Sequence, residues 1–325
     1  MRMKHLTVAA LTLLLSVSCS QRQEDYPFRN PDLPIDERID DLLKRLTAEE
    51  KIGQMMNTTP AIERLGIPEY DWWNEALHGV ARAGKATVFP QAIAMAATFD
   101  DDALYETFTM VSDEARAKYH QYQKNKEYDR YKGLTFWTPN INIFRDPRWG
   151  RGMETYGEDP YLTEKMGVAV TRGLQGDDPN YYKTHACAKH YAVHSGPEWN
   201  RHESNAEATP RDLYETYLPA FEALVKEGDV QEVMCAYNRF EGKPCCSSDK
   251  LLIDILRNSW GYDNIILSDC GAIDDFWRKD KNTPRHETHP DAESASADAV
   301  LNGTDLECGG SYRALNKALA DGKIS

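Results

Sequence analysis

A carboxylate at the end of a buried strand is the first feature of this sequence that could do chemistry. Residues 264–267 form a short apolar run, which predicts a strand buried on both faces, as in a parallel sheet. Asp269 follows this run, and Gly271 lets the backbone turn after it. Asp269 could simply cap the next helix. However, α/β folds place catalytic and binding residues at the carboxyl ends of parallel strands, and other polar strand ends favour that role here.

Three further predicted strands also end in charged or hydrogen-bonding groups. A charged lysine within an apolar run costs several kcal/mol unless it is paired, so we expect Lys189 and His190 to lie where a strand end opens into a cleft. A satisfied structural pair is the alternative. The three strands are residues 136–143, which lead into the arginine-rich loop 145–151, residues 186–193, and residues 232–238, which include Tyr237.

Residues 70–80 combine two adjacent tryptophans with amide, acid and imidazole side chains, among them Glu75. Flat aromatic faces and hydrogen-bonding groups suit the wall and floor of a site for a small polyhydroxylated ligand. The same composition is equally compatible with a packed loop.

The charge balance argues against one class of partner. The chain has 38 Lys and Arg residues against 52 Asp and Glu residues, for a net charge of −14. A phosphate-binding surface needs clustered cations, and none stands out, so we expect no nucleic acid partner. His185, His190 and His194 suggest a metal site, but they lack the glutamate of a zinc-binding helix motif. We therefore expect neither a metal nor a cofactor.

The elements that position these residues alternate between strands and helices. Strands separated by helices at this spacing predict an α/β protein, specifically a (β/α)8 TIM-type barrel, allowing for irregular or missing strands. A short strand is also predicted over residues 303–306. Helices are predicted for residues 39–46, 47–55, 92–95, 101–119, 212–226, 251–258, 294–301 and 312–320.

The first residues are not part of the barrel. Residues 1–19 have two cations, a short apolar core and small residues before Cys19, the pattern of a secretory signal of the bacterial lipoprotein type. We expect export to the periplasm or attachment to the outer membrane through a lipid on Cys19, with simple export as the alternative. Residues 20–35 form a polar tether. The barrel domain then covers residues 36–325.

Six cysteines remain after Cys19. Export permits disulfides, but four of the six lie in or beside predicted buried strands, so free buried thiols are the default expectation. Cys245 and Cys246 are the pair most prone to oxidation. The six are Cys187, Cys235, Cys245, Cys246, Cys270 and Cys308.

Taken together, the motifs resemble the first domain of family 3 glycoside hydrolases. The resemblance implies a retaining mechanism in which Asp269 is the nucleophile. It also implies that Arg145, Lys189 and His190 hold sugar hydroxyls, and that Tyr237 lines the pocket. Lys189 and Arg145 would then keep Asp269 ionised. The matching motifs are residues 73–79, 145–151, 188–191, 234–238 and 268–271.

Within that family the motifs look most like the β-xylosidase branch. Glucosidases of the family usually carry the shorter aspartate where this chain has Glu75. The extra methylene pushes a carboxylate into the space of a hexose hydroxymethyl group, so a pentose fits and a hexose clashes. The alternatives are a β-glucosidase or a dual xylosidase/arabinofuranosidase of the same family.

The expected general acid is missing from this chain. Two-domain members take it from a C-terminal α/β domain, which is absent here, so the chain is expected to be truncated and that domain to belong to the same protein. A single-domain branch uses a His-Asp pair, but Asn200 replaces its Asp although His202 is in register. A non-catalytic carbohydrate-binding lipoprotein is the alternative of a different class, with an oligosaccharide as ligand in either case.

Overall fold

The structure of the protein is a computed structural model, and it describes residues 26–325. The predicted signal and Cys19 lie outside the described residues. The chain divides into two units, Met1–Leu46 and Thr47–Ser325. Across residues 26–325, no helix combines the length and the apolarity that crossing a membrane requires.

The first unit contains the 3-10 turn η1 (Pro27–Arg29) and the helix α1 (Ile35–Arg45). The helix holds the turn through side chains. Arg38 Nε donates to the carbonyl of Phe28 at 3.0 Å, and Asp41 accepts from the backbone N–H of Phe28 at 3.2 Å.

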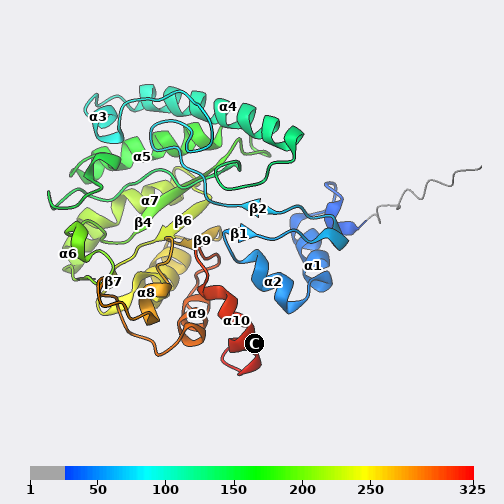
Figure 1. Ribbon diagram of the computed structural model, residues 1–325. Helices are drawn as coiled ribbons and strands as arrows, with labels where there is room; N and C mark the ends of the chain where they lie inside the picture. The colour runs from blue at the N-terminus through cyan, green and yellow to red at the C-terminus, as the bar shows by residue number, and fades with distance from the viewer. Residues whose placement is uncertain (1–25) are drawn as a thin grey trace, which may run out of the picture. The chain divides into compact units, whose positions relative to one another are not determined.

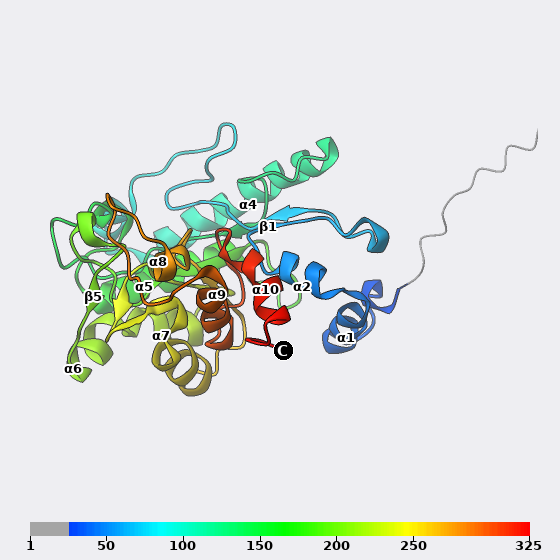
Figure 2. The same ribbon diagram turned by 60° about the horizontal axis from the view of Figure 1, so that its bottom comes forward.

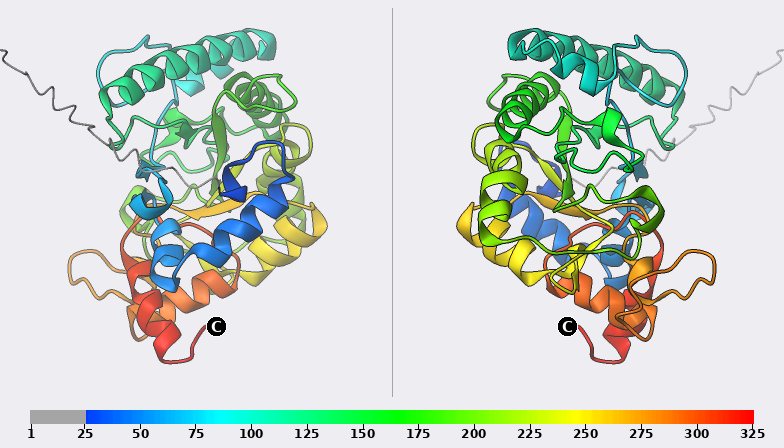
Figure 3. Two further views of the ribbon diagram at one scale, coloured as in Figure 1. Left: turned by 90° about the vertical axis from the view of Figure 1, so that its right-hand side faces the viewer. Right: turned by 90° about the vertical axis from the view of Figure 1, so that its left-hand side faces the viewer.

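The second unit is built around a parallel sheet. Its strands are β3 (Thr135–Phe136), β4 (His185–Tyr191), β6 (Glu232–Cys235) and β9 (Ile265–Ser268), paired in that order. Beyond these four strands the sheet is extended by single parallel bridges. They join Leu267 to Leu306, Glu307 to Met56 and Phe136 to Asn74. The antiparallel pair β1 (Thr58–Thr59) and β2 (Tyr70–Asp71) joins the two ends. Figure 3 shows strands between helices on opposite sides, and the prediction of an irregular TIM-type barrel is confirmed.

Three predicted strands are clearly shorter in the structure. The predicted strand 303–306 is a single bridge at Leu306, the strand predicted for residues 136–143 is limited to Thr135–Phe136, and the strand predicted for residues 232–238 ends at Cys235. In addition, β1 and β2 run antiparallel because the chain between them forms only the 3-10 turn η2 (Glu63–Leu65). A parallel return needs a longer crossover, normally a helix.

Several helices begin at residues that cap their first turn. Thr47 and Glu50 form a capping box, and Asp100, Asp159 and Asp291 each accept a backbone N–H of the first turn. Helix α4 lies alongside α5 (Figure 1), and α9 lies beside α10 (Figure 2). The remaining bounds are α2 (Ala48–Gln54), α3 (Ala92–Ala96), α4 (Asp101–Asn125), η3 (Gly152–Glu154), α5 (Pro160–Gln175), η4 (Glu198–Asn200), β5 (Asn205–Ala206), α6 (Pro210–Asp212), the π-helix η5 (Leu213–Tyr217), α7 (Pro219–Lys226), β7 (Arg239–Phe240), β8 (Lys243–Pro244), η6 (Cys245–Ser247), the π-helix η7 (Lys250–Ser259), α8 (Asp274–Trp277), α9 (Ala292–Leu301), η8 (Ser311–Ala314) and α10 (Leu315–Ala320).

Alternation along the strands creates two apolar clusters. One face of each strand packs with the helices, as Ala188, Val233 and Ile266 do. The other face forms a smaller cluster that includes Cys187 and Leu267 and fills the barrel interior. Positions two residues further along have the same orientation. The alternation therefore aims Lys189 and Asp269 toward the barrel axis.

The disulfide pattern corrects the expectation of free thiols. Cys235 bonds to Cys246, and Cys270 bonds to Cys308. Cys245 is a buried free thiol, as is Cys187, so Cys245 and Cys246 are not bonded to each other. The Cα atoms of consecutive residues lie about 3.8 Å apart, closer than a relaxed disulfide requires. Cys246 therefore bonds across to the end of β6.

Glu307, in the bridge next to Leu306, is fully buried. Its two carboxylate oxygens accept the backbone N–H groups of Ser311 and Tyr312 at 2.8 and 2.6 Å, at the start of η8. Burial nevertheless dominates and raises the pKa of Glu307 to about 7. The folded protein therefore holds this proton more tightly than the unfolded chain does.

We expect stability to fall as the pH rises through this range. The contribution of Glu307 is fully present below its ordinary pKa of 4.5 and is lost as the pH passes about 7. Because each tenfold change in proton affinity is worth about 1.4 kcal/mol, the loss is on the order of 3 kcal/mol. Thermal unfolding of the parent and of Glu307→Gln between pH 4 and 8 measures it. Glu307→Gln should flatten this decline, whereas Glu49→Gln, at an exposed site, should not. Equal slopes for the parent and Glu307→Gln would contradict the assignment.

Candidate active site

Asp269 follows β9 and is buried at the end of the barrel strands. Its Oδ1 accepts the backbone N–H of Cys270 at 2.7 Å. Its Oδ2 has no hydrogen-bond partner within residues 26–325. A buried carboxylate oxygen without a partner is costly to keep in a fold, which is typical of a functional group.

Two side chains from other elements face Oδ2 of Asp269. Arg151 Nη1 lies 4.0 Å away, and His190 Nε2 lies 3.5 Å away. Burial raises the pKa of Asp269 above its ordinary value, and the positive charges of Arg151 and Lys189 oppose this rise. Nearby cations were expected to keep Asp269 ionised. They do oppose the rise of its pKa, but desolvation outweighs them.

The ring of His190 is held as one tautomer. Burial, followed by the charge of Arg151, lowers the pKa of His190 well below its usual value, so the ring is neutral. An arginine can only donate, so the 3.0 Å contact from Arg151 Nη1 makes Nε2 of His190 the acceptor. The ring proton is then on Nδ1, which donates to Asn142 Oδ1 at 2.9 Å. A register shift between Lys189 and Tyr191 interrupts the alternation and allows His190 to turn toward Asp269.

Lys189 and Glu75 form the second pair of the site. Lys189 Nζ lies 3.4 Å from Oε2 of Glu75, and both side chains are largely buried. The indole N–H of Trp73 donates to Oε1 of Glu75 at 2.9 Å. Both carboxylate oxygens of Glu75 are therefore held, which satisfies the predicted need of Lys189 for a partner.

The arginine prediction was wrong in its position. Arg145 is exposed and forms no ion pair with Asp269. Arg151, at the end of the same motif, turns inward and forms two hydrogen bonds with the carboxylate of Glu154, at 2.9 and 2.7 Å. This fork orients the guanidinium so that its third nitrogen is left to face His190 and Asp269. The predicted loop does bring an arginine to Asp269, but it is Arg151 rather than Arg145.

The structure places Tyr237 beside the segment that follows Asp269. Its hydroxyl donates to the carbonyl of Cys270 at 2.8 Å. The ring of His202 packs on the ring of Tyr237, with centroids 4.4 Å apart. His202 does pair with an aspartate, but with Asp275, 2.8 Å from its Nδ1, rather than with a residue near position 200.

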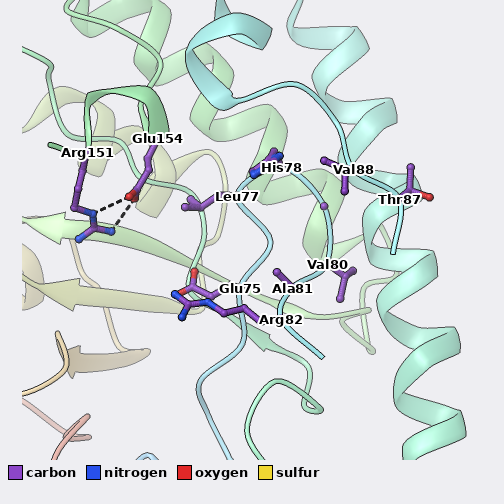
Figure 4. A pocket seen from close by; sticks show the side chains of 11 residues that line it. Glu75, Leu77, His78, Val80, Ala81, Arg82, Thr87, Val88, Arg151 and Glu154 are labelled. Atoms are coloured by element: carbon purple, nitrogen blue, oxygen red, sulfur yellow. Dashed lines mark hydrogen bonds and ion pairs between the residues drawn. The ribbon is translucent and has the colours of Figure 1, made fainter. Parts of the chain in front are cut away.

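A pocket of about 240 Å³ opens next to this group (Figure 4). Arg151 lines the pocket and faces Asp269, and Glu75 lines the pocket and pairs with Lys189. Figure 4 shows Arg151 and Glu154 on one side and the segment from Leu77 to Val88 on the other. The predicted motif around Glu75 therefore forms a wall, which favours a ligand site over a packed loop.

Sequence reasoning missed three functional neighbours, Arg151, Glu154 and Asn142. Arg151 stood within the quoted motif, and Glu154 follows it three residues later at a spacing that allows a salt bridge. Asn142 carried no signal of its own, because its role depends on the pairing of two distant segments. It accepts from the backbone N–H and from Nδ1 of His190, both at 2.9 Å.

The arrangement suits attack by Asp269 on an electron-poor carbon. Oδ2 is the free oxygen, Oδ1 is held, and a cation lies near enough to favour the ionised form. Lys189, Glu75 and Arg151 present donors and acceptors around it, as hydroxyl-bearing ligands require. Burial favours the protonated form of Glu154, but the hydrogen bonds and charges of Arg151, Lys189 and Asn140 together lower its pKa, so Glu154 is a poor proton donor.

The chain is similar in sequence and fold to several known proteins. A xylan 1,4-beta-xylosidase of Xylanibacter ruminicola is 50% identical over 321 residues, covering 97% of this chain and 37% of the relative. A beta-xylosidase/alpha-L-arabinofuranosidase of Medicago sativa is 41% identical, covering 88% of this chain and 37% of the relative. A solved exo-beta-xylosidase of family 3, in complex with a xylobiose aziridine probe, is 34% identical with a TM-score of 0.83, covering 92% of this chain and 39% of that structure.

These three proteins are much longer than the chain. The chain spans less than two-fifths of the length of each of these three proteins. The model of the glycosyl hydrolase family 3 N-terminal domain matches residues 39–325, which include every residue of the site described above. The barrel, the buried Asp269 and this match together show that the chain belongs to glycosyl hydrolase family 3 and carries that family's N-terminal domain.

Proposed function

We propose that this protein is a retaining exo-acting β-xylosidase that releases xylose from xylo-oligosaccharides. The observation that carries the proposal is the buried Oδ2 of Asp269, which accepts no hydrogen bond from the described residues and faces Arg151 and His190. In a retaining mechanism one carboxylate attacks the anomeric carbon and forms a covalent glycosyl-enzyme, which water then hydrolyses. Asp269 is the proposed nucleophile.

The remaining site residues have binding roles in this proposal. Lys189, His190 and Glu75 bind hydroxyls of the sugar next to Asp269, and Arg151 takes the role first expected of Arg145. Tyr237 holds the backbone beyond Asp269 through the carbonyl of Cys270. Glu75 and Glu154 are both held in ion pairs, so neither is the proposed general acid.

The choice of a pentose rests on Glu75. Its carboxylate is held on both oxygens and lines the pocket, so it does not swing aside for a larger sugar. The β-xylosidase names of two of the relatives described above support the same substrate class. A dual xylosidase/arabinofuranosidase is the second candidate, favoured by the relative from Medicago sativa.

A trapping experiment tests the proposal. A 2-deoxy-2-fluoro-β-xyloside with a dinitrophenyl leaving group needs little acid assistance to form the covalent intermediate. We expect intact-mass analysis to show one added fluoroxylosyl group and peptide mapping to place it on Asp269. The matching glucoside should label far more slowly, and an arabinofuranoside tests the second candidate. A label on another carboxylate would refute the assignment of the nucleophile, and no label at all would favour a carbohydrate-binding protein.

We propose in addition that residues 1–19 direct export and that Cys19 carries a lipid, placing the protein in the periplasm or on the outer membrane. The support is the order of charged, apolar and small residues before Cys19. Fractionation of cells that express the parent or Cys19→Ala tests this: the variant should move from the membrane to the soluble fraction. An unchanged membrane fraction would exclude the lipid on Cys19.

A further inference from the structure

The direction of the Asp269 side chain depends on the backbone of the next residue. Oδ1 accepts from Cys270 N at 2.7 Å, while Oδ2 accepts no hydrogen bond from residues 26–325. A shift of the Cys270 N–H therefore rotates the carboxylate and moves Oδ2. Reaction between two positioned groups is sensitive to such movements, and a misplacement of about 1 Å can cost about 100-fold in rate.

Regular strand pairing ends just before this point. The last ladder contacts of β9 are the hydrogen bonds from Ser268 N to the carbonyl of Leu306 at 2.9 Å and from Asp269 N to the carbonyl of Cys235 at 3.2 Å. Beyond them the chain turns at Gly271, whose φ is 80°, a conformation that glycine adopts readily. Cys270 thus lies between the end of a strand and a flexible turn.

A disulfide and a small hydrogen-bond network join the segment around Cys270 to the segment around Cys308. Cys270 is bonded to Cys308, which follows the neighbouring bridge at Leu306. The N–H of Cys308 donates to Oγ of Ser268 at 3.0 Å, and the N–H of Gly271 donates to the carbonyl of Cys308 at 2.7 Å. Cys308 is itself followed by two glycines. Without the disulfide, two flexible segments would meet only through hydrogen bonds.

The other disulfide offers a contrast in the same barrel. It joins Cys235 at the end of β6 to Cys246 in η6, and both residues are fully buried. Its side chains do not contact the carboxylate of Asp269, and the contact of Cys235 with Asp269 is through a backbone carbonyl. It anchors an element of the fold rather than the residue that orients Asp269.

We propose that the Cys270–Cys308 disulfide is a positioning element that holds the Asp269 carboxylate in its reactive orientation. The inference rests on the proposed function, since it concerns the residue assigned as nucleophile. The disulfide acts through the backbone of Cys270. It changes neither the charge of Asp269 nor the charges of the cations beside it. It is therefore expected to affect the rate of attack far more than the binding of the sugar.

The experiment compares Cys270→Ser/Cys308→Ser with Cys235→Ser/Cys246→Ser and the parent. The readout is covalent labelling by the dinitrophenyl 2-deoxy-2-fluoro-β-xyloside, followed by intact mass at several concentrations, well below each unfolding temperature. For Cys270→Ser/Cys308→Ser we expect the limiting labelling rate to fall about 10- to 100-fold, with little change in the concentration giving half of that rate. The other pair should lower the unfolding temperature but keep the labelling rate.

Three results would count against the proposal. Labelling of Cys270→Ser/Cys308→Ser at the parental rate would overturn this inference and leave the proposed function standing. Equal losses in both variants would assign the effect to general stability. A parent that does not label would overturn the proposed function and this inference with it.

A second measurement covers the case in which Cys270→Ser/Cys308→Ser does not fold. Cys270 is partly exposed, whereas Cys235 and Cys246 are buried. A phosphine should therefore reduce the Cys270–Cys308 bond of the folded parent first, which thiol mapping by mass spectrometry verifies. Labelling should slow as this bond opens and recover on reoxidation, and a constant rate would refute the proposal.

Discussion

Asp269→Asn is expected to abolish turnover of an aryl β-xyloside, with kcat lower by about 10⁴- to 10⁶-fold. The amide is nearly the same size as the carboxylate but cannot attack the anomeric carbon. Because burial raises the pKa of Asp269, the charged side chain opposes folding. Removing the charge should leave the unfolding temperature unchanged or raise it. Steady-state kinetics and thermal unfolding measure the two effects.

Two results separate this role from a structural one. Asp254→Asn, at an exposed position in η7, should change neither rate nor stability. If Asp269→Asn loses activity and also unfolds at a much lower temperature, the loss reflects a damaged fold. Activity within about tenfold of the parent would exclude Asp269 as the nucleophile.

Glu75→Asp is expected to shift the ratio of kcat/KM for xyloside over glucoside toward the glucoside by about 10- to 200-fold, the range of about 1–3 kcal/mol that one methylene commands in a pocket. The shorter side chain withdraws the carboxylate from the pocket wall and makes room for a hydroxymethyl group. It also cannot reach both Trp73 and Lys189, which now hold its two oxygens at 2.9 and 3.4 Å. Some loss on xylosides should therefore accompany the gain on glucosides.

Trp73→Phe is the matched control for this change. It removes the indole N–H that orients Glu75 but keeps the full length of the acid. If space decides the preference, Trp73→Phe lowers activity on both sugars and preserves their ratio. If Trp73→Phe shifts the ratio as much as Glu75→Asp does, orientation rather than length sets the preference. An unchanged ratio in Glu75→Asp would place the pentose preference elsewhere.

The sequence by itself determined the barrel and the strand that carries Asp269. Short apolar runs and polar strand ends are local signals, because each depends on neighbours a few residues away. The strands predicted from them around Lys189 and before Asp269 are confirmed where the structure describes the chain.

Only the tertiary structure decided which partners these residues meet. Whether Arg145 or Arg151 enters the site depends on how the loop folds around Glu154, and both stood in the same motif. The pairing of Cys270 with Cys308 joins positions 38 residues apart and could not be deduced from a list of cysteines. The same holds for the pairing of His202 with Asp275, which lie 73 residues apart.

The electrostatics of the site also depended on the fold. Nearby cations suggested a low pKa for Asp269, but desolvation, which sums over every atom packed around the carboxylate, raises it instead. Burial likewise keeps His190 neutral, and the hydrogen bond that Arg151 donates to Nε2 leaves the ring proton on Nδ1, which donates to Asn142. A sequence shows which charges are present. Their protonation states are decided by how much water the packed chain excludes, because the cost of a buried charge depends on its whole surroundings.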